Sequence, residues 1–146
     1  MTFEQLIHSL ASKLQIEIEN IGGAAAIEID GTTVILQDAG DMLLLRADVG
    51  EMPPGDPAAL FKAALEGNYL YQGTGGSTLA LDPESGCLHL QHYNWLERLD
   101  PDSALDVLFR FENTLSAWKE LLDAYRPNDV SSENGQAAIS SGYIHA

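Results

Sequence analysis

The stretch Ala-Ala-Ala-Ile-Glu-Ile-Asp-Gly-Thr-Thr-Val-Ile-Leu-Gln, residues 24–37, decides the fold. In its first half Ile27 and Ile29 alternate with Glu28, the period of two that is typical of a strand. Asp30-Gly31 stands at the centre, and this pair is typical of a two-residue type I′ turn, because both central residues of that turn need a positive φ. The stretch therefore predicts an antiparallel hairpin.

A third strand, residues 42–49, follows a turn at residues 38–41, so that the three strands form an antiparallel meander. We take Asp30-Gly31 as the first two-residue loop and Ala39-Gly40 as the second. The expected cross-strand pairs are then Ile29 with Thr32, Ile27 with Val34, Leu36 with Leu43, and Val34 with Leu45.

The meander carries large apolar side chains on both of its faces. The face expected to form the core carries Ile27, Ile29, Val34, Leu36, Leu43, Leu45 and Val49. The other face carries Ile35, Met42 and Leu44 beside Glu28, Thr33 and Arg46. One interpretation is that this second face recognises another molecule. The alternative is that the long C-terminal helix covers one face and the N-terminal helix covers the other.

Three helices and a second hairpin complete the pattern. Thr2 and Gln5 form an expected capping box at the start of an amphipathic helix. The expected helices are residues 2–15, 56–66 and 100–125, and the second hairpin is residues 77–82 and 87–95. The order α-βββ-α-ββ-α predicts an α+β fold, an antiparallel sheet packed with helices. We expect a single domain over residues 1–126 and a flexible tail over 127–146.

The second helix, Asp56–Glu66, is apolar nearly all round, with Pro57 at its start and Gly67 expected as the glycine that ends it. Such a helix must be buried. A sheet already served by two longer helices offers it little room, so a contact between two copies across a two-fold axis is plausible. The expected dimer residues are Leu60, Phe61, Ala64 and Leu65.

Charge excludes several classes of function. The 146 residues hold 7 Lys and Arg against 22 Asp and Glu, a formal net charge of −15. This balance argues against nucleic acid and against anionic membrane surfaces as partners.

One cysteine, Cys87, excludes an intramolecular disulfide and a cysteine zinc cluster. Runs such as Met42–Leu45 are too short to span a bilayer, and the first residues lack a basic secretion signal. We expect a soluble cytosolic protein.

No catalytic or metal site can be assembled from the sequence. The stretch Gly73–Thr78 is rich in glycine, but it lacks the lysine and the following helix of a phosphate-binding loop, so we interpret it as a linker. His89 and His92 are three apart on a predicted strand, which sends them to opposite faces. Cys87 has no cationic neighbour in sequence that would activate its thiol. We expect no enzyme, cofactor or metal.

Taken together, the order of elements, the size and the charge resemble the class I type III secretion chaperones, the Tir-chaperone (CesT-type) family. The resemblance runs from Phe3 to Tyr125. It is carried by the opening Phe3–Ile7, by the strand Leu43–Val49 leading to Pro53, by Leu79–Leu90, and by the closing Leu115–Leu122.

The resemblance implies a small acidic homodimer in the bacterial cytoplasm, without ATP or metal. It would bind a secreted effector near its N-terminus in extended form and keep it competent for secretion. The second helix would supply most of the dimer contacts. Apolar patches on the sheet and the first helix, drawing on Ile35, Met42 and Leu44, would bind the cargo. Gly22–Ala26 and the tail match no feature of the family. The alternatives are a regulatory or scaffold domain of the same fold without cargo, and an enzyme whose site forms only in three dimensions.

Overall fold

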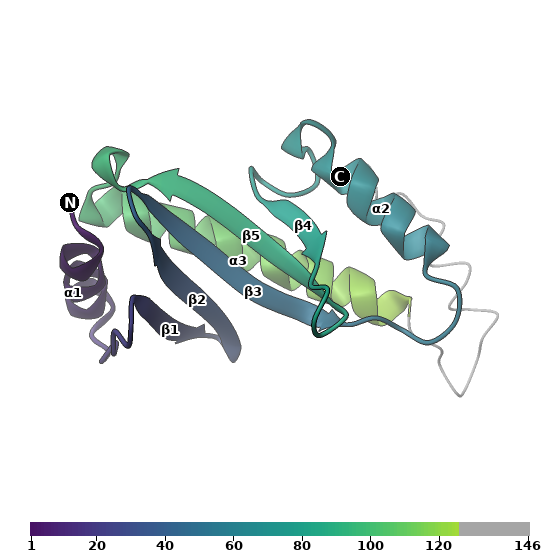
Figure 1. Ribbon diagram of the computed structural model, residues 1–146, viewed down its shortest axis with the longest axis horizontal. Helices are drawn as coiled ribbons and strands as arrows, with labels where there is room; N and C mark the ends of the chain where they lie inside the picture. The colour runs from purple at the N-terminus through teal and green to yellow at the C-terminus, as the bar shows by residue number, and fades with distance from the viewer. Residues whose placement is uncertain (126–146) are drawn as a thin grey trace. The chain divides into compact units, whose positions relative to one another are not determined.

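The computed structural model describes residues 1–125 (Figure 1). Its helices are α1 (Phe3–Leu14), α2 (Ala58–Asn68) and α3 (Pro101–Ala124), with short 3₁₀ turns η1 (Tyr69–Tyr71) and η2 (Leu96–Arg98). Its strands are β1 (Ala24–Ile29), β2 (Thr32–Ala39), β3 (Met42–Glu51), β4 (Thr78–Leu81) and β5 (Cys87–Trp95). The predicted order α-βββ-α-ββ-α is confirmed. The expected flexible tail, residues 127–146, lies outside the described residues.

The strands form one five-stranded sheet in the order β1-β2-β3-β5-β4. The β1–β2 hairpin has the predicted register, with Ile29 opposite Thr32 and Ile27 opposite Val34. Its turn residues Asp30 and Gly31 have φ values of 50° and 79°, as a two-residue hairpin turn of this kind requires.

The predicted register between β2 and β3 is wrong by two residues. Leu36 lies opposite Leu45 instead of Leu43, and Ala39 lies opposite Met42, so the loop is Gly40-Asp41 and not Ala39-Gly40. Gly40 takes the positive φ of 78° that the turn needs, and the Asp38 side chain accepts a hydrogen bond from its N–H at 3.0 Å. A shift of two keeps every side chain on its face. The predicted division into two faces therefore survives the error.

The described residues fall into two compact units, which we describe one at a time. Unit 1 consists of Met1–Ala47 and Gln91–Asn113, and unit 2 consists of Asp48–Leu90 and the chain from Thr114 onward. The expected single domain over residues 1–126 stays a prediction.

The core of unit 1 lies between one face of the meander and apolar residues of α1 and α3. The predicted core residues Ile27, Val34, Leu36, Leu43 and Leu45 are 2% exposed or less. The apolar stripe of α1 buries Phe3, Leu6, Ile7 and Leu10, and the Thr2–Gln5 capping box is present. Helix α3 adds Ala104, Leu108 and Phe111 to the buried apolar residues of this unit.

Asp100 caps the N-terminus of α3. Its carboxylate accepts a hydrogen bond from the Ser103 N–H at 2.8 Å, and its own N–H donates to the Ser103 hydroxyl at 2.9 Å. The Ser103 backbone hydrogen bond lowers the pKa of Asp100 below its ordinary 3.8. A lowered pKa in the folded state means that the cap stabilises the fold above about pH 3.8 and weakens as the pH falls further.

Unit 2 is organised by a close contact between two glycines and Trp118. Gly67 lies inside α2, so its predicted role as the glycine that ends the helix is wrong, and the helix continues to Asn68. A Cβ at Gly67 would lie 2.6 Å from Cζ2 of Trp118. The Trp118 indole donates a hydrogen bond to the Gly73 carbonyl at 2.7 Å, and the Gly73 N–H donates to the Gly67 carbonyl at 3.0 Å. The ring is held, and glycine is the residue that fits beneath it.

The other end of α2 also differs slightly from expectation. The helix begins at Ala58, two residues after the expected Asp56, and Pro57 stands at the cap position. The Asp56 carboxylate still accepts a hydrogen bond from the Ala58 N–H at 3.0 Å. The sequence therefore placed the start of the helix within two residues of its actual position, and Asp56 still bonds to the first helical residue.

We expect Gly67→Ala to lower the free energy of unfolding by about 1–3 kcal/mol, because the new methyl group collides with a ring that cannot retreat. Helix propensity alone predicts the opposite, a gain of about 1 kcal/mol. Urea denaturation of the single variants and of Gly67→Ala/Trp118→Leu measures the coupling. Alanine should cost little in the Trp118→Leu background, and an equal cost in both backgrounds would contradict the contact.

Candidate partner-binding surface

The face of β2 and β3 that points away from the core is partly open to solvent. We call the half-buried residues Ile35, Gln37, Met42, Leu44 and Arg46 the outer face of unit 1. They alternate with core residues along both strands. Their neighbours Ala26, Glu28 and Thr33 are exposed. Within residues 1–125, this partial exposure does not favour the alternative in which the N-terminal helix covers this face.

The register brings the three predicted cargo residues onto this one face. Ile35 lies opposite Arg46, and Leu44 lies opposite Gln37. The Arg46 Nε donates a hydrogen bond to the Gln37 side chain at 3.0 Å, which ties β3 to β2 across the face. Polar groups are thus paired with one another, and the apolar side chains between them stay accessible.

A hollow of about 460 Å³ opens at the β1 side of this face. Ile35, Ala26 and the stem of Arg46 line it on the sheet, and Glu17, Glu19 and Ile21 line it from the segment before β1. Ile21 is 68% exposed. Of the predicted cargo residues, Ile35 lines the hollow, whereas Met42 and Leu44 lie elsewhere on the face.

The Gly22–Ala26 stretch, which had no assigned role, builds one wall of this hollow. Gly22 and Gly23 have φ values of 61° and 81° and form a tight turn. Across it Ile21 and Ala24 exchange two backbone hydrogen bonds of 2.9 and 3.2 Å. The glycine pair was visible in the sequence as a turn signal, but its neighbourhood to Ile35 depends on the sheet.

Strand β1 is the last strand at its side of the sheet. Ala25, Ile27 and Ile29 occupy the hydrogen-bonded positions opposite β2, as follows from the two-residue hairpin. The N–H and C=O groups of Ala26 and Glu28 therefore point away from β2, where an added strand can pair with them. Those of Ala24 are already bonded to Ile21.

Two aromatic residues of β5 add to the outer face, and sequence reasoning missed them. Tyr93 and Trp95 are 50% and 43% exposed, and they alternate with His92 and Asn94, whose Nδ2 is buried. Strand β5 lies next to β3 in the sheet, and the Leu96 N–H donates to the Asp41 carbonyl at 2.9 Å. The aromatic residues at i and i+2 around a polar Asn94 were the available signal.

Unit 2 carries further exposed apolar residues, which we call together the α2 patch. It consists of Phe61, Leu65, Tyr69, Leu70, Tyr71 and Leu81, which are 37% to 70% exposed. Leu60 and Ala64, predicted as dimer residues, are buried within unit 2 at 1% and 7% exposure. Leu70 and Tyr71 have positive φ values of 51° and 57°, a conformation that non-glycine residues rarely adopt.

The residues considered for chemistry do not converge. The His89 Nε2 lies 3.8 Å from a carboxylate oxygen of Asp82, whose pKa is lowered chiefly by a hydrogen bond from the Glu84 N–H. Cys87 is buried. Within residues 1–125 no three His, Cys, Asp or Glu side chains are grouped so that they could hold a metal ion. The loop before β4 leads into a strand at Thr78, as the linker interpretation expects.

The family model of the Tir chaperone protein (CesT) family matches residues 5–119. The chain belongs to this family. A search of curated protein sequences finds no match. None of the described helices is both long and apolar enough to cross a membrane.

Solved structures share the fold. The chain is similar to a chain of the HopA1–SchA chaperone–effector complex, at 19% identity and a TM-score of 0.67 over 81% of this chain and 93% of that one. It is similar to a chain of the ExsC–ExsE complex, at 18% identity and 0.67 over 81% and 91%. A third is the ExoU–SpcU complex of Pseudomonas aeruginosa, at 19% identity and 0.62 over 80% and 93%.

Proposed function

We propose that this protein is a type III secretion chaperone that binds the N-terminal region of a secreted effector in extended form. The observation that carries the proposal is the half-buried apolar outer face beside the edge strand β1 within residues 1–125, in a chain of the Tir chaperone family. The role is binding and not catalysis. It is exercised in the bacterial cytosol, where an effector waits before secretion.

The geometry supports an extended segment as the ligand. Such a segment adds to β1 as a further strand, since the N–H and C=O groups of Ala26 and Glu28 point away from β2 there. Its alternate side chains then enter the hollow beside Ile35. The remaining apolar contacts fall on Met42 and Leu44, and methionine adapts its shape to irregular side chains. A segment bound in this way is kept from aggregating without being folded.

We also propose that the protein is a two-fold dimer through the α2 patch. Phe61 and Leu65 point into solvent, and Leu60 and Ala64 support them from within unit 2. On the same helix Lys62 and Glu66 lie 3.5 Å apart and neutralise one another. The patch therefore carries little net charge, which lets two copies approach although each chain has a net charge of −15.

Replacing Met42 and Leu44 by Asp should abolish effector capture and leave folding almost unchanged. Both residues are half-buried on the outer face, where a substitution costs less stability than the several kcal/mol expected at a core position. The measurement is a pull-down with the purified chain from cytosol of the source bacterium, with identification of the captured protein and a melting curve of each variant.

His8→Asp/Asn113→Asp is the matched control, because it adds two carboxylates at exposed helix positions in the same unit. It should capture the effector as the wild type does. Unfolding of the Met42/Leu44 variant would mean that these residues belong to the core. Undiminished capture by a folded variant would place the recognition surface elsewhere.

Leu65→Glu should convert the dimer into a monomer. A charge buried in an interface costs about 3 kcal/mol or more, which raises the dissociation constant by about a hundredfold. Light scattering at micromolar concentration should give twice the chain mass of 15.8 kDa for the wild type and the single mass for the variant. Asn113→Glu, which adds the same charge at an exposed residue of unit 1, should stay dimeric. A monomeric wild type contradicts the proposal.

A further inference from the structure

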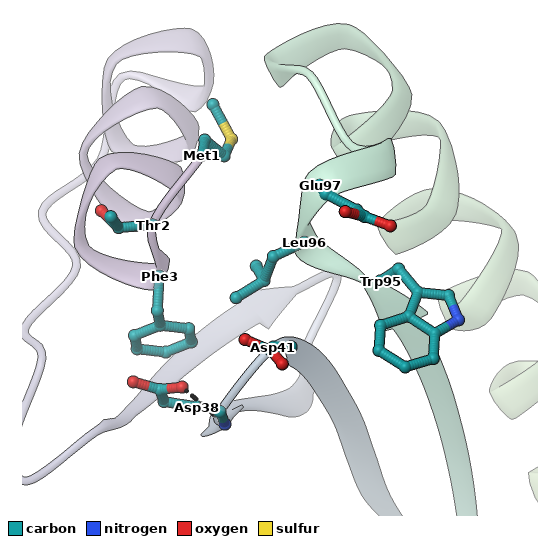
Figure 2. A pocket seen from close by; sticks show the side chains of 9 residues that line it. Met1, Thr2, Phe3, Asp38, Asp41, Trp95, Leu96 and Glu97 are labelled. Carbon is teal, nitrogen blue, oxygen red and sulfur yellow. Dashed lines mark hydrogen bonds between the residues drawn. The ribbon is translucent and has the colours of Figure 1, made fainter.

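A second hollow of about 460 Å³ opens in unit 1 where the β2–β3 turn, the start of α1 and the end of β5 meet (Figure 2). We call it the acidic pocket. Phe3 and Leu96 form its apolar floor and are 4% and 6% exposed. The Trp95 indole stands at one side and is 43% exposed, so that part of its surface faces solvent. The pocket thus has a buried apolar floor and a partly exposed aromatic ring at its side.

Three carboxylates complete the wall: Asp38 lies near the end of β2, Asp41 lies in the β2–β3 turn, and Glu97 lies in η2 (Figure 2). Asp38 uses one oxygen to accept the Gly40 N–H at 3.0 Å. Among the described residues, Asp41 and Glu97 have no ion-pair partner. The amino group of Met1 is the one cationic group among the nine lining residues, so the pocket keeps an excess of negative charge.

The pocket is continuous with the outer face through Trp95. This residue lines the pocket and also lies two positions from Tyr93 on the exposed side of β5. Strand β5 is the neighbour of β3, which carries Met42 and Leu44. The hydrogen bond between the Leu96 N–H and the Asp41 carbonyl ties the two walls together at 2.9 Å. Trp95 is therefore the residue through which a segment on the outer face would reach the pocket.

We propose that the acidic pocket binds an arginine side chain of the protein segment held on the outer face; the source of that arginine rests on the proposed function. A guanidinium is flat and weakly hydrated, so it stacks on an indole while its N–H groups donate to carboxylates on either side. Trp95 supplies the ring, and Asp41 and Glu97 supply the acceptors. Lysine has the charge but not the flat shape, so arginine is the preferred occupant.

The test uses N-acetyl-L-arginine amide as the probe and the full chain labelled with ¹⁵N at its tryptophans. The indole N–H of Trp95 should shift in a saturable manner with a dissociation constant of about 1 mM, as expected for one weakly held side chain. N-acetyl-citrulline amide has nearly the same shape without the charge and should bind at least about fivefold more weakly. Trp118 is 5% exposed and is the internal control that should not move.

Asp41→Asn/Glu97→Gln should weaken arginine binding by about fivefold or more, since two exposed charges are lost. Asp38 is left intact, because its carboxylate holds the turn at Gly40. The control Glu84→Gln/Glu120→Gln removes the same charge at exposed positions in unit 2 and should bind the probe as the wild type does. Trp95→Leu should weaken binding while keeping the apolar wall.

Equal shifts with the arginine and citrulline probes would overturn the proposal. So would unchanged binding by Asp41→Asn/Glu97→Gln, or an equal loss in the Glu84→Gln/Glu120→Gln control. The probe binds without any cargo, so this result is independent of the pull-down. A chain that binds arginine amide but captures no secreted protein contradicts the proposed function and, with it, the effector as the source of the arginine.

Discussion

A strand that places large apolar residues on both of its faces requires cover on both, and residues 1–125 cover only one of them fully. On the inner side Ile27 and Val34 are 1% and 0% exposed beneath the helices. On the other side Ile35, Met42 and Leu44 remain half-buried, with Tyr93 and Trp95 exposed beside them. A partner that covers these groups would gain the free energy of burying them. The candidate site of unit 1 follows from this one imbalance.

Unit 2 likewise buries one side of an apolar element, helix α2, and exposes the other. Gly67 allows the Trp118 ring to pack directly on the backbone of α2, and a hydrogen bond of 2.7 Å to the Gly73 carbonyl holds the ring there. The buried side of α2 is then closed by Leu60 and Ala64. The opposite side has no described cover over Phe61 and Leu65. The described part of the chain therefore has two exposed apolar surfaces, the outer face of unit 1 and the α2 patch. We propose an effector segment as the partner of the first and a second copy of the chain as the partner of the second.

The parts of the fold that depend on local chemistry could be predicted from the sequence. Alternation and Asp30-Gly31 predicted the β1–β2 register and the division into faces, because a period of two leaves no intermediate choice. The β2–β3 register was missed, since Asp38-Ala39-Gly40-Asp41 contains more than one plausible two-residue loop. Gly67 was misread because a glycine that ends a helix and a glycine beneath an indole look alike in sequence. Trp95 was missed because strand alternation does not say which face a helix covers.

The negative charge of the chain has two physical effects. A net charge of −15 keeps a chain with exposed apolar surfaces in solution, and at the acidic pocket it becomes a local attraction for a cationic side chain. Membership of the Tir chaperone family limits the class of partner that we expect for this chain. The fold alone would not limit it, because one fold can serve many functions.

The central claim is that an extended effector segment pairs with β1 and covers the outer face. Amide hydrogen exchange of β1, measured with and without the captured effector segment, tests it most directly. The account predicts that exchange at Ala26 and Glu28 slows on binding, whereas Ile27, whose N–H is directed toward β2, changes little. Unchanged exchange at Ala26 and Glu28 in a saturated complex would contradict the claim.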